Sequence, residues 1–388
     1  MLPEARKNEV LGRFKGGLNR VPVSRKIKPG DPDWGVVMPG DPEHRVYVWI
    51  EALCNYLTIV DQPGQPDRRA FWPKDRPLAV HLMAKDILWF HAVVWPAMLH
   101  ALGEQPPATV YAHAYWIAEG KKMSKSLGNF VEIDTLRAYA DRYSLDAVRW
   151  FLATQGPLGA NDADFAHARF VEVYNADLAN SFGNSASRVG NMIDKYFSGV
   201  LGKTCDGRFG FEGGKALQAA LDARAAAGKP AEGPARTFDF AALTRDAAAR
   251  FRDGVDRLDL EAALGEGLAI VRAVDEFITY SAPFTLAKRD DEAARGALGA
   301  ILYSCAEALR IASLLLSPAM PRKTAALWQA WGCAHLRDPS DENSGFVAPL
   351  AELAAWGGAH AVRADQVIAK GDALFMRADA AEAAPSGA

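Results

Sequence analysis

The sequence predicts an α/β fold followed by an all-α part. Residues 1 to about 130 alternate short β-like runs with helical stretches and Pro/Gly turns, which is typical of α/β proteins with a mostly parallel sheet. After Asp134, apolar residues recur three and four positions apart almost to the end of the chain, which predicts amphipathic helices. With 388 residues, 49% of them hydrophobic, the chain can bury a sizeable core.

Three apolar runs predict the strands of the first part: RVYVWI (45–50), LAVHLM (78–83) and TVYAHAYWI (109–117). A longer apolar segment, ILWFHAVVWPAMLHALG (87–103), contains two histidines and a proline. Because a membrane-spanning helix needs about 20 apolar residues, we expect this segment to be a buried core helix. The first ten residues are polar and show no signal-peptide pattern, so we expect a soluble, cytoplasmic protein without a membrane partner.

Four segments of the second part carry the helical periodicity of a bundle: 135–153, 167–197, 260–282 and 291–317. The Ala/Gly/Pro-rich stretch 224–236 predicts a flexible insert between helices, and ADAAEAAPSGA (378–388) predicts a disordered tail. We therefore expect domains at 1–134 and 135–332, with a C-terminal extension over 333–388. Apolar patches in that extension are expected to pack back on the first domain.

Charge and cysteine content limit the possible partners. The formal net charge is −3, so any contact with nucleic acid must use local basic patches. The four cysteines are scattered without paired spacing, which argues against a disulfide framework and fits a reducing compartment. For the same reason we expect no protein-bound zinc or other metal site.

One loop, GKKMSKSLGN (120–129), concentrates lysines and serines between glycines. Lysine ammonium groups are mobile charges suited to phosphate oxygens, and hydroxyl and backbone N–H groups add hydrogen-bond donors. A solvated surface turn is the alternative interpretation of the same composition. Composition alone favours the surface turn, so the choice between the two depends on the particular order of residues 122–126, Lys-Met-Ser-Lys-Ser.

These five residues resemble the signature loop of class I aminoacyl-tRNA synthetases. Three further segments occur in the order expected of methionyl-tRNA synthetases: YVWIEALCNY (47–56), KDILWFHAVVWPAML (85–99) and NADLANSFGNSASR (175–188). The resemblance extends from about residue 4 to residue 332. It implies the C-terminal half of a class I nucleotide-binding (Rossmann-like) catalytic fold, followed by a helical-bundle anticodon-binding domain. It also implies ATP-dependent ligation of methionine to its tRNA through a methionyl adenylate.

The resemblance assigns roles to residues of the first domain. Lys125, supported by Lys122, would stabilise the charge on the departing pyrophosphate. Mg²⁺ would accompany the ATP, held mainly by phosphates and water. The residues implied in ATP binding are Lys85, Asp86, Lys122, Ser124, Lys125 and Ser126. Those implied in methionine binding are Trp49, Ala52, Tyr56, His91 and Trp95, which would otherwise be core aromatics and their neighbours.

The resemblance also assigns anticodon binding to the helical domain. Asn184 and Arg188 are four residues apart and share a helix face, and Phe284 stands where many relatives carry tryptophan. An aromatic ring, an amide and a guanidinium suit unpaired bases, which stack on rings and are hydrogen-bonded at their edges. Polar groups on a helix face and a buried phenylalanine are the alternative interpretation.

The His-x-Gly-His signature of class I synthetases is absent from the eight histidines. A parallel sheet without its first strands would expose an edge and an apolar face. This pattern predicts a fragment, a truncated reading frame or one half of a split enzyme whose partner chain supplies the rest. A tRNA-binding module without catalysis stays open. Another class I synthetase, of the leucyl or cysteinyl type, is disfavoured by residues 47–56 and 85–99.

Overall fold

A computed structural model of the chain describes residues 1–30, 34–64, 66–210, 237–333, 336, 346–379, 381 and 383–385. The expected insert at 224–236 and part of the expected tail after residue 378 lie outside these residues. The chain folds into two compact units, Met1–Ile117 with Pro157–Asp164, and Ala118–Gly156 with Phe165–Ala388. It passes from one to the other within β6 (Trp116–Ala118), between Gly156 and Pro157, and within β8 (Ala163–Phe165). The units divide at residue 117, so the lysine loop lies in the second unit.

In the first unit, β4 (Val80–Ala84) pairs in parallel with β5 (Thr109–His113). Leu2 adds a parallel bridge to Tyr111 on the other side of β5. The expectation of a mostly parallel sheet is wrong beyond this pair, because β3 pairs antiparallel with both β1 and β2. The bounds of these strands and of those near the crossing are β1 (Ser24–Lys26), β2 (Val37–Met38), β3 (Asp41–Val46), β6 (Trp116–Ala118), β7 (Lys121–Lys122) and β8 (Ala163–Phe165).

Two predicted strands need correction. Only the start of RVYVWI is a strand, because α2 (Val48–Thr58) begins at its fourth residue and buries Leu53. The helix is favoured over a longer strand because it buries Leu53 in a core that also contains Trp95 and Leu99. The run TVYAHAYWI divides into β5 and β6. The helices of this unit are α1 (Glu4–Lys15), η1 (Arg69–Phe71), η2 (Lys85–Ile87), the π-helical η3 (Phe90–Val94) and α3 (Trp95–Leu102).

Strand β4 presents its apolar residues to both sides. His81 and Met83 point inward and are buried, whereas Val80 and Leu82 are 50% and 65% exposed. In the described part of the chain, β4 pairs only with β5, so its other edge carries no strand. The exposed edge and apolar face predicted from the sequence are therefore present.

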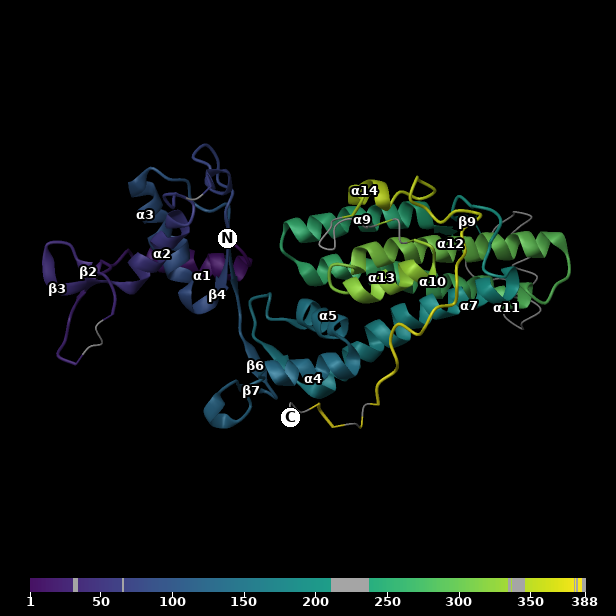
Figure 1. Ribbon diagram of the computed structural model, residues 1–388, viewed down its shortest axis with the longest axis horizontal. Coiled ribbons are helices and arrows are strands. Elements are labelled where there is room, and N and C mark those ends of the chain that lie inside the picture. The colour runs from purple at the N-terminus through teal and green to yellow at the C-terminus, as the bar shows by residue number, and fades with distance from the viewer. Residues whose placement is uncertain are drawn as a thin grey trace. The chain divides into compact units, whose positions relative to one another are not determined.

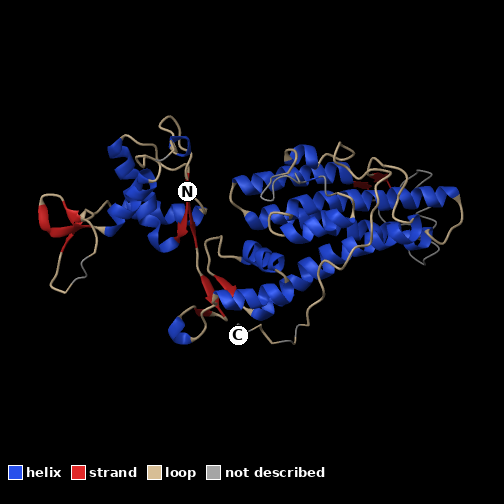
Figure 2. Ribbon diagram, viewed as in Figure 1, coloured by secondary structure: helices blue, strands red, loops and turns tan. Residues whose placement is uncertain are grey.

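The second unit is helical (Figure 2). The predicted helix over 135–153 is two helices, because Ser144 adopts a φ of 105° between them and caps the second. The predicted helices over 260–282 and 291–317 are present as α10 and α12. The helices are α4 (Ile133–Tyr143), η4 (Lys125–Leu127), α5 (Leu145–Gln155), α6 (His167–Val173), the π-helical η5 (Tyr174–Gly183), α7 (Asn184–Phe197), α9 (Phe240–Asp256), α10 (Leu260–Ser281), α11 (Pro283–Leu286), α12 (Glu292–Leu316), α13 (Pro321–Ala330) and α14 (Leu350–Leu353). The strands β9 (Arg208–Gly210) and β10 (Thr237–Asp239) pair antiparallel.

Helix α12 forms the centre of the second unit, where it packs against α7, α9, α10 and α13 (Figure 1). By length and composition α12 could cross a membrane, but 89% of its apolar stretch of 18 residues is buried inside the protein. Such burial is typical of the core helix of a globular unit. The shorter apolar segment Phe90–Leu102 likewise buries His91, Trp95 and Leu99.

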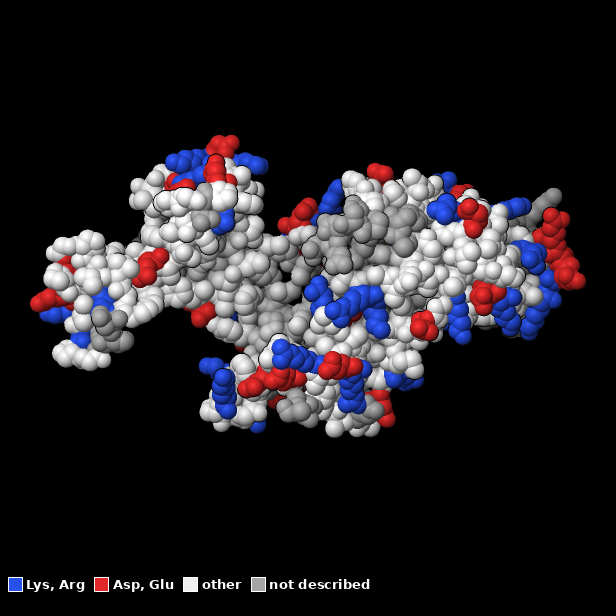
Figure 3. Space-filling model, viewed as in Figure 1, with Lys and Arg blue, Asp and Glu red and all other residues white. Residues whose placement is uncertain are grey.

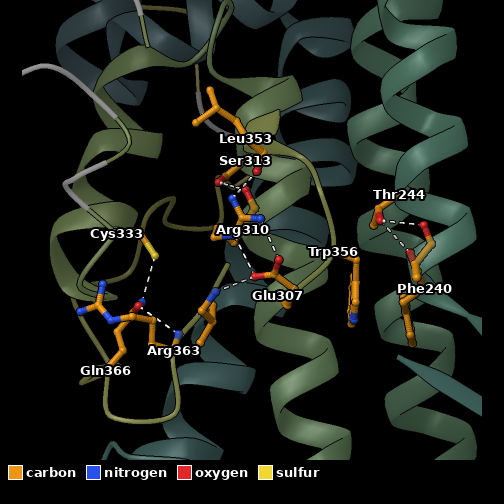
Figure 4. A network of polar contacts seen from close by, with 12 residues as sticks. Phe240, Thr244, Glu307, Arg310, Ser313, Cys333, Leu353, Trp356, Arg363 and Gln366 are labelled. Atoms are coloured by element: carbon orange, nitrogen blue, oxygen red, sulfur yellow. Dashed lines mark hydrogen bonds and ion pairs between the residues drawn. The ribbon is translucent and has the colours of Figure 1, made fainter. Parts of the chain in front are cut away.

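The C-terminal segment packs on these helices, which corrects the expectation that it covers the first domain. Arg310 forms a fully buried ion pair with Glu307 at 2.7 Å and donates to the carbonyl oxygen of Leu353 at 2.8 Å (Figure 4). The backbone N–H of Val362 donates to Glu307 Oε2 at 2.9 Å, so the pair holds both ends of the segment 353–362. Gln366 then donates to the Trp331 carbonyl oxygen at 2.5 Å.

Candidate functional site

An aromatic cluster in the first unit contains most of the residues expected to bind methionine. The Tyr56 hydroxyl lies 3.1 Å from His91 Nε2, and the Tyr56 and Trp95 rings are 6.0 Å apart. His91 Nδ1 lies 3.2 Å from the carbonyl oxygen of Ile87, which can only accept a hydrogen bond. Nδ1 therefore carries the proton, and Nε2 accepts from Tyr56. Burial lowers the pKa of His91, which keeps the ring neutral.

Trp49 and Ala52, the other two residues expected to bind methionine, lie on the same side of α2 as Tyr56. Trp49, Ala52 and Tyr56 recur at helical spacing, and the buried Leu53 lies one turn after Trp49 on the adjoining side of the helix. Trp49 stacks on Phe90 with ring centroids 4.9 Å apart, and its edge lies 6.4 Å from His91. Ala52 is exposed, so this face of the helix stays open to a ligand.

Two members of the cluster were missed by the sequence reasoning, His81 and Trp72. Their rings are 5.8 Å apart, and His81 lies 4.3 Å from the ring of Tyr56. Burial, with a smaller contribution from the nearby His91, lowers the pKa of His81 to about 4. The nitrogens His81 Nε2 and Trp95 Nε1 are buried without a hydrogen-bond partner in the described structure. The alternation of β4, which points His81 inward with Met83, was the available signal.

A polar network follows the carboxyl ends of β4 and β5. Lys85 forms an ion pair with Asp162 at 2.6 Å and lies over the Tyr115 ring at 5.1 Å. The backbone N–H of Tyr115 also donates to Asp162, at 2.8 Å. The hydrogen bond from Lys85, together with that N–H, lowers the pKa of Asp162. A hydrogen bond to Asp86 is the largest of the effects that raise the pKa of Tyr115. Lys85 and Asp86, both predicted to bind ATP, thus share Tyr115 as a neighbour.

The lysine loop of the second unit is held by Asn129. Its Oδ1 accepts from the backbone N–H of Ser124 at 2.9 Å, and its Nδ2 donates to the carbonyl oxygen of Lys122 at 3.1 Å. The hydroxyls of Ser124 and Ser126 are 2.7 Å apart, and Lys125 lies over the ring of Phe130. The glycines Gly120 and Gly128 both adopt positive φ, which permits the tight turns at each end of the loop.

The predicted anticodon residues lie on two helices of the second unit. Asn184 begins α7 and is exposed, and Arg188 lies one turn later with 34% of its side chain exposed. Phe284 on α11 is 45% exposed, so it is not the buried phenylalanine of the alternative interpretation. Figure 3 shows basic and acidic side chains interspersed on the visible face of the molecule. Within the described part of the chain, no three His, Cys, Asp or Glu side chains gather as a metal site requires.

Comparisons with known proteins agree with these motifs. Residues 2–190 match the family described as tRNA synthetases class I (M). The chain is 37% identical over 332 residues to the methionine–tRNA ligase of Caldanaerobacter subterraneus subsp. tengcongensis, covering 85% of this chain and 46% of that protein. It is 33% identical over 385 residues to the ligase of Bacillus subtilis, covering 98% and 50%. The chain belongs to the methionyl-tRNA synthetase family.

A solved methionyl-tRNA synthetase has the same fold. The structure of the Mycobacterium tuberculosis enzyme bound by methionyl-adenylate superposes with a TM-score of 0.73 at 28% identity, covering 97% of this chain and 64% of that one. The chain spans about half the length of the curated methionyl-tRNA synthetases that it matches. A mixed α/β part followed by a helical part is therefore the architecture of this family, as the sequence predicted.

Proposed function

We propose that the chain takes part in ATP-dependent ligation of methionine to its tRNA, through a methionyl adenylate. The observation that carries this proposal is the Tyr56–His91 hydrogen bond inside the aromatic cluster. A neutral, largely apolar site with a few polar tips suits a thioether, whose sulfur packs well against aromatic rings. The nitrogens His81 Nε2 and Trp95 Nε1, which have no hydrogen-bond partner in the described structure, add two polar atoms to this site.

The part of the chain up to residue 134 would supply the chemistry. Lys125, with Lys122, would neutralise charge that develops on the departing pyrophosphate. Lys85 and Asp86 would contact the ribose of ATP. The Lys85 ammonium would then leave its ion pair with Asp162 and bind a hydroxyl of the nucleotide instead. Mg²⁺ would enter with the ATP, held by its phosphates and by water. In the helical part, Asn184, Arg188 and Phe284 would read the anticodon, and both activities would take place in the cytoplasm.

The catalytic site requires groups that these 388 residues do not contain, since no His-x-Gly-His occurs among them. Among the strands that the structure describes, none pairs with the other edge of β4, where Val80 and Leu82 are exposed, so this edge offers a place for a further parallel strand. We propose that a strand of a separate chain that carries this signature pairs there. A second candidate function, tRNA binding without adenylation, is favoured by the exposed Phe284 and needs no further chain.

Methionine-dependent ATP–pyrophosphate exchange with the purified chain tests the proposal. Lys125→Ala should abolish exchange, and Lys121→Ala, a neighbouring exposed lysine outside the signature, is the matched control. Exchange that is lost only in Lys125→Ala supports ligation by this chain. Without exchange in the wild type, the assay is repeated with the N-terminal catalytic half of a relative. Continued absence, with tRNA binding retained, favours the binding module.

A further inference from the structure

Two side chains of α7 converge on one carboxylate of α10. The Ser185 hydroxyl donates to Asp275 Oδ1 at 2.6 Å, and Arg188 Nη1 lies 3.5 Å from the same oxygen. Ser185 and Arg188 are three residues apart, so they project from the same face of α7. Ser185 is fully buried, whereas the side chains of Arg188 and Asp275 are 34% and 29% exposed. The guanidinium thus contacts the carboxylate through Nη1, and part of the Arg188 side chain is exposed.

Ser185 restricts the Asp275 carboxylate, and the carboxylate in turn restricts the guanidinium of Arg188. A short hydrogen bond from a buried serine fixes the rotamer of the carboxylate, because the hydroxyl would otherwise be left unsatisfied. Burial raises the pKa of Asp275, and the contacts with Ser185 and Arg188 oppose this by stabilising its charged form. Arginine carries five N–H donors in a planar fork, so one contact with Asp275 leaves donors for a ligand.

We infer that Asp275 is a positioning residue, which orients the Arg188 guanidinium toward the edge of an unpaired RNA base. This inference rests on the proposed anticodon-reading role of Arg188. An oriented side chain loses less conformational freedom on binding than a free one. A base edge that offers hydrogen-bond acceptors fits a planar fork held in one orientation, whereas a phosphate needs only a nearby charge. Asp275 would therefore contribute to discrimination between anticodons more than to overall affinity.

The test compares two RNA hairpins, one with the methionine anticodon and one with a single changed anticodon base. Their affinities for the full chain are measured at one fixed salt concentration by fluorescence anisotropy. Asp275→Ala should reduce the ratio of the two affinities about tenfold, the value of one well-placed charge-assisted hydrogen bond. Asp275→Asn, which keeps an acceptor for both partners, should stay within about twofold of the wild type.

Because both substitutions remove the same charge, their difference isolates the geometry of the acceptor. Equal loss in Asp275→Ala and Asp275→Asn would overturn the inference, since charge alone would then explain the effect. Adding Arg188→Ala to Asp275→Ala should change the ratio little, and an additive loss would also overturn it. Should Asp275→Ala fail to fold, Ser185→Ala removes the orienting bond and keeps both charges, so an unchanged ratio would overturn the inference. If Arg188→Ala alone leaves the ratio unchanged, the proposed anticodon role itself fails.

Discussion

The side chain of Asn129 accepts a hydrogen bond from the backbone N–H of Ser124 at 2.9 Å, five residues earlier in the chain. The same amide donates to the carbonyl oxygen of Lys122 at 3.1 Å, and to that of Ala118 at 3.4 Å. One asparagine therefore ties both ends of the lysine loop to each other. Lys125 lies between these ties, so its backbone is restrained while its ammonium group stays exposed.

We expect Asn129→Ala to loosen this loop without unfolding the helices behind it. Loss of these side-chain bonds, each worth about 0.5–1.5 kcal/mol, should raise local opening of the loop. Hydrogen–deuterium exchange of the amides of residues 122–128 should become about tenfold faster. Asn191→Ala, at an exposed position of α7, is the control and should leave these amides unchanged. Unchanged exchange in Asn129→Ala would show that the backbone alone holds the loop.

Tyr56→Phe should weaken methionine binding about two- to tenfold, because it deletes the hydroxyl that donates to His91 Nε2. The ring and its packing against Trp95 are retained. Isothermal titration with methionine measures the change directly. Tyr196→Phe, on α7 of the second unit, should bind methionine as the wild type does. Equal affinity in both variants would remove the Tyr56–His91 pair from the binding site.

Acidification should destabilise the first unit through His81. Its pKa is lowered from 6.5 to about 4, so between these values an unfolded imidazole takes up a proton that the folded one does not. This group makes no difference to stability at higher pH, where both states are neutral. Between pH 6.5 and about pH 4, up to about 1.4 kcal/mol of the free energy of unfolding is lost per pH unit. The lowered pKa of His91 acts in the same direction.

Native-state hydrogen exchange of amides in the first unit, at about pH 7.5 and about pH 5, measures this loss. His81→Gln should lose about 1–2 kcal/mol less on acidification than the wild type. Only the change between the two pH values is compared, because lost packing against Trp72 lowers stability at both. An identical pH dependence in wild type and variant would mean that His81 is already protonated when folded.

Glu307→Gln should destabilise the second unit by about 3–5 kcal/mol, because it leaves the fully buried Arg310 charge unpaired. Urea denaturation followed by helical circular dichroism reports the change. The double variant Glu307→Gln/Arg310→Met should cost less than Glu307→Gln alone. Glu172→Gln, in the exposed pair with Arg169, should cost below about 1 kcal/mol. A loss that small at Glu307 would show that the pair does not hold the C-terminal segment.

Long helices were predictable because their apolar periodicity is local. The segments 260–282 and 291–317 match α10 and α12 almost residue for residue. The stretch RVYVWI was mispredicted for the complementary reason. Its β-branched and aromatic residues favour a strand locally, but the helix that begins at Val48 places Leu53 against Trp95 and Leu99.

The candidate site shows the same contrast between residues that local patterns identify and residues that only the fold brings together. Lys122, Lys125, Tyr56 and His91 could be selected from motifs, since each motif is a short contiguous string. His81, Trp72 and Asp275 could not, because their roles depend on partners that the fold supplies. His81 lies on a strand and meets His91 of the following helix, and Arg188 and Asp275 lie on separate helices, so neither contact follows from one contiguous string.

By itself, the sequence determined the family, the order of an α/β part and a helical part, and the residues of the lysine loop. These depend on local periodicity and on contiguous strings, which need no knowledge of the fold. Only the tertiary structure decided which side chains are buried, which are paired, and therefore how they titrate. Burial and pairing are set by residues that folding brings together, and the cost of moving a charge or a hydrogen bond out of water depends on those neighbours.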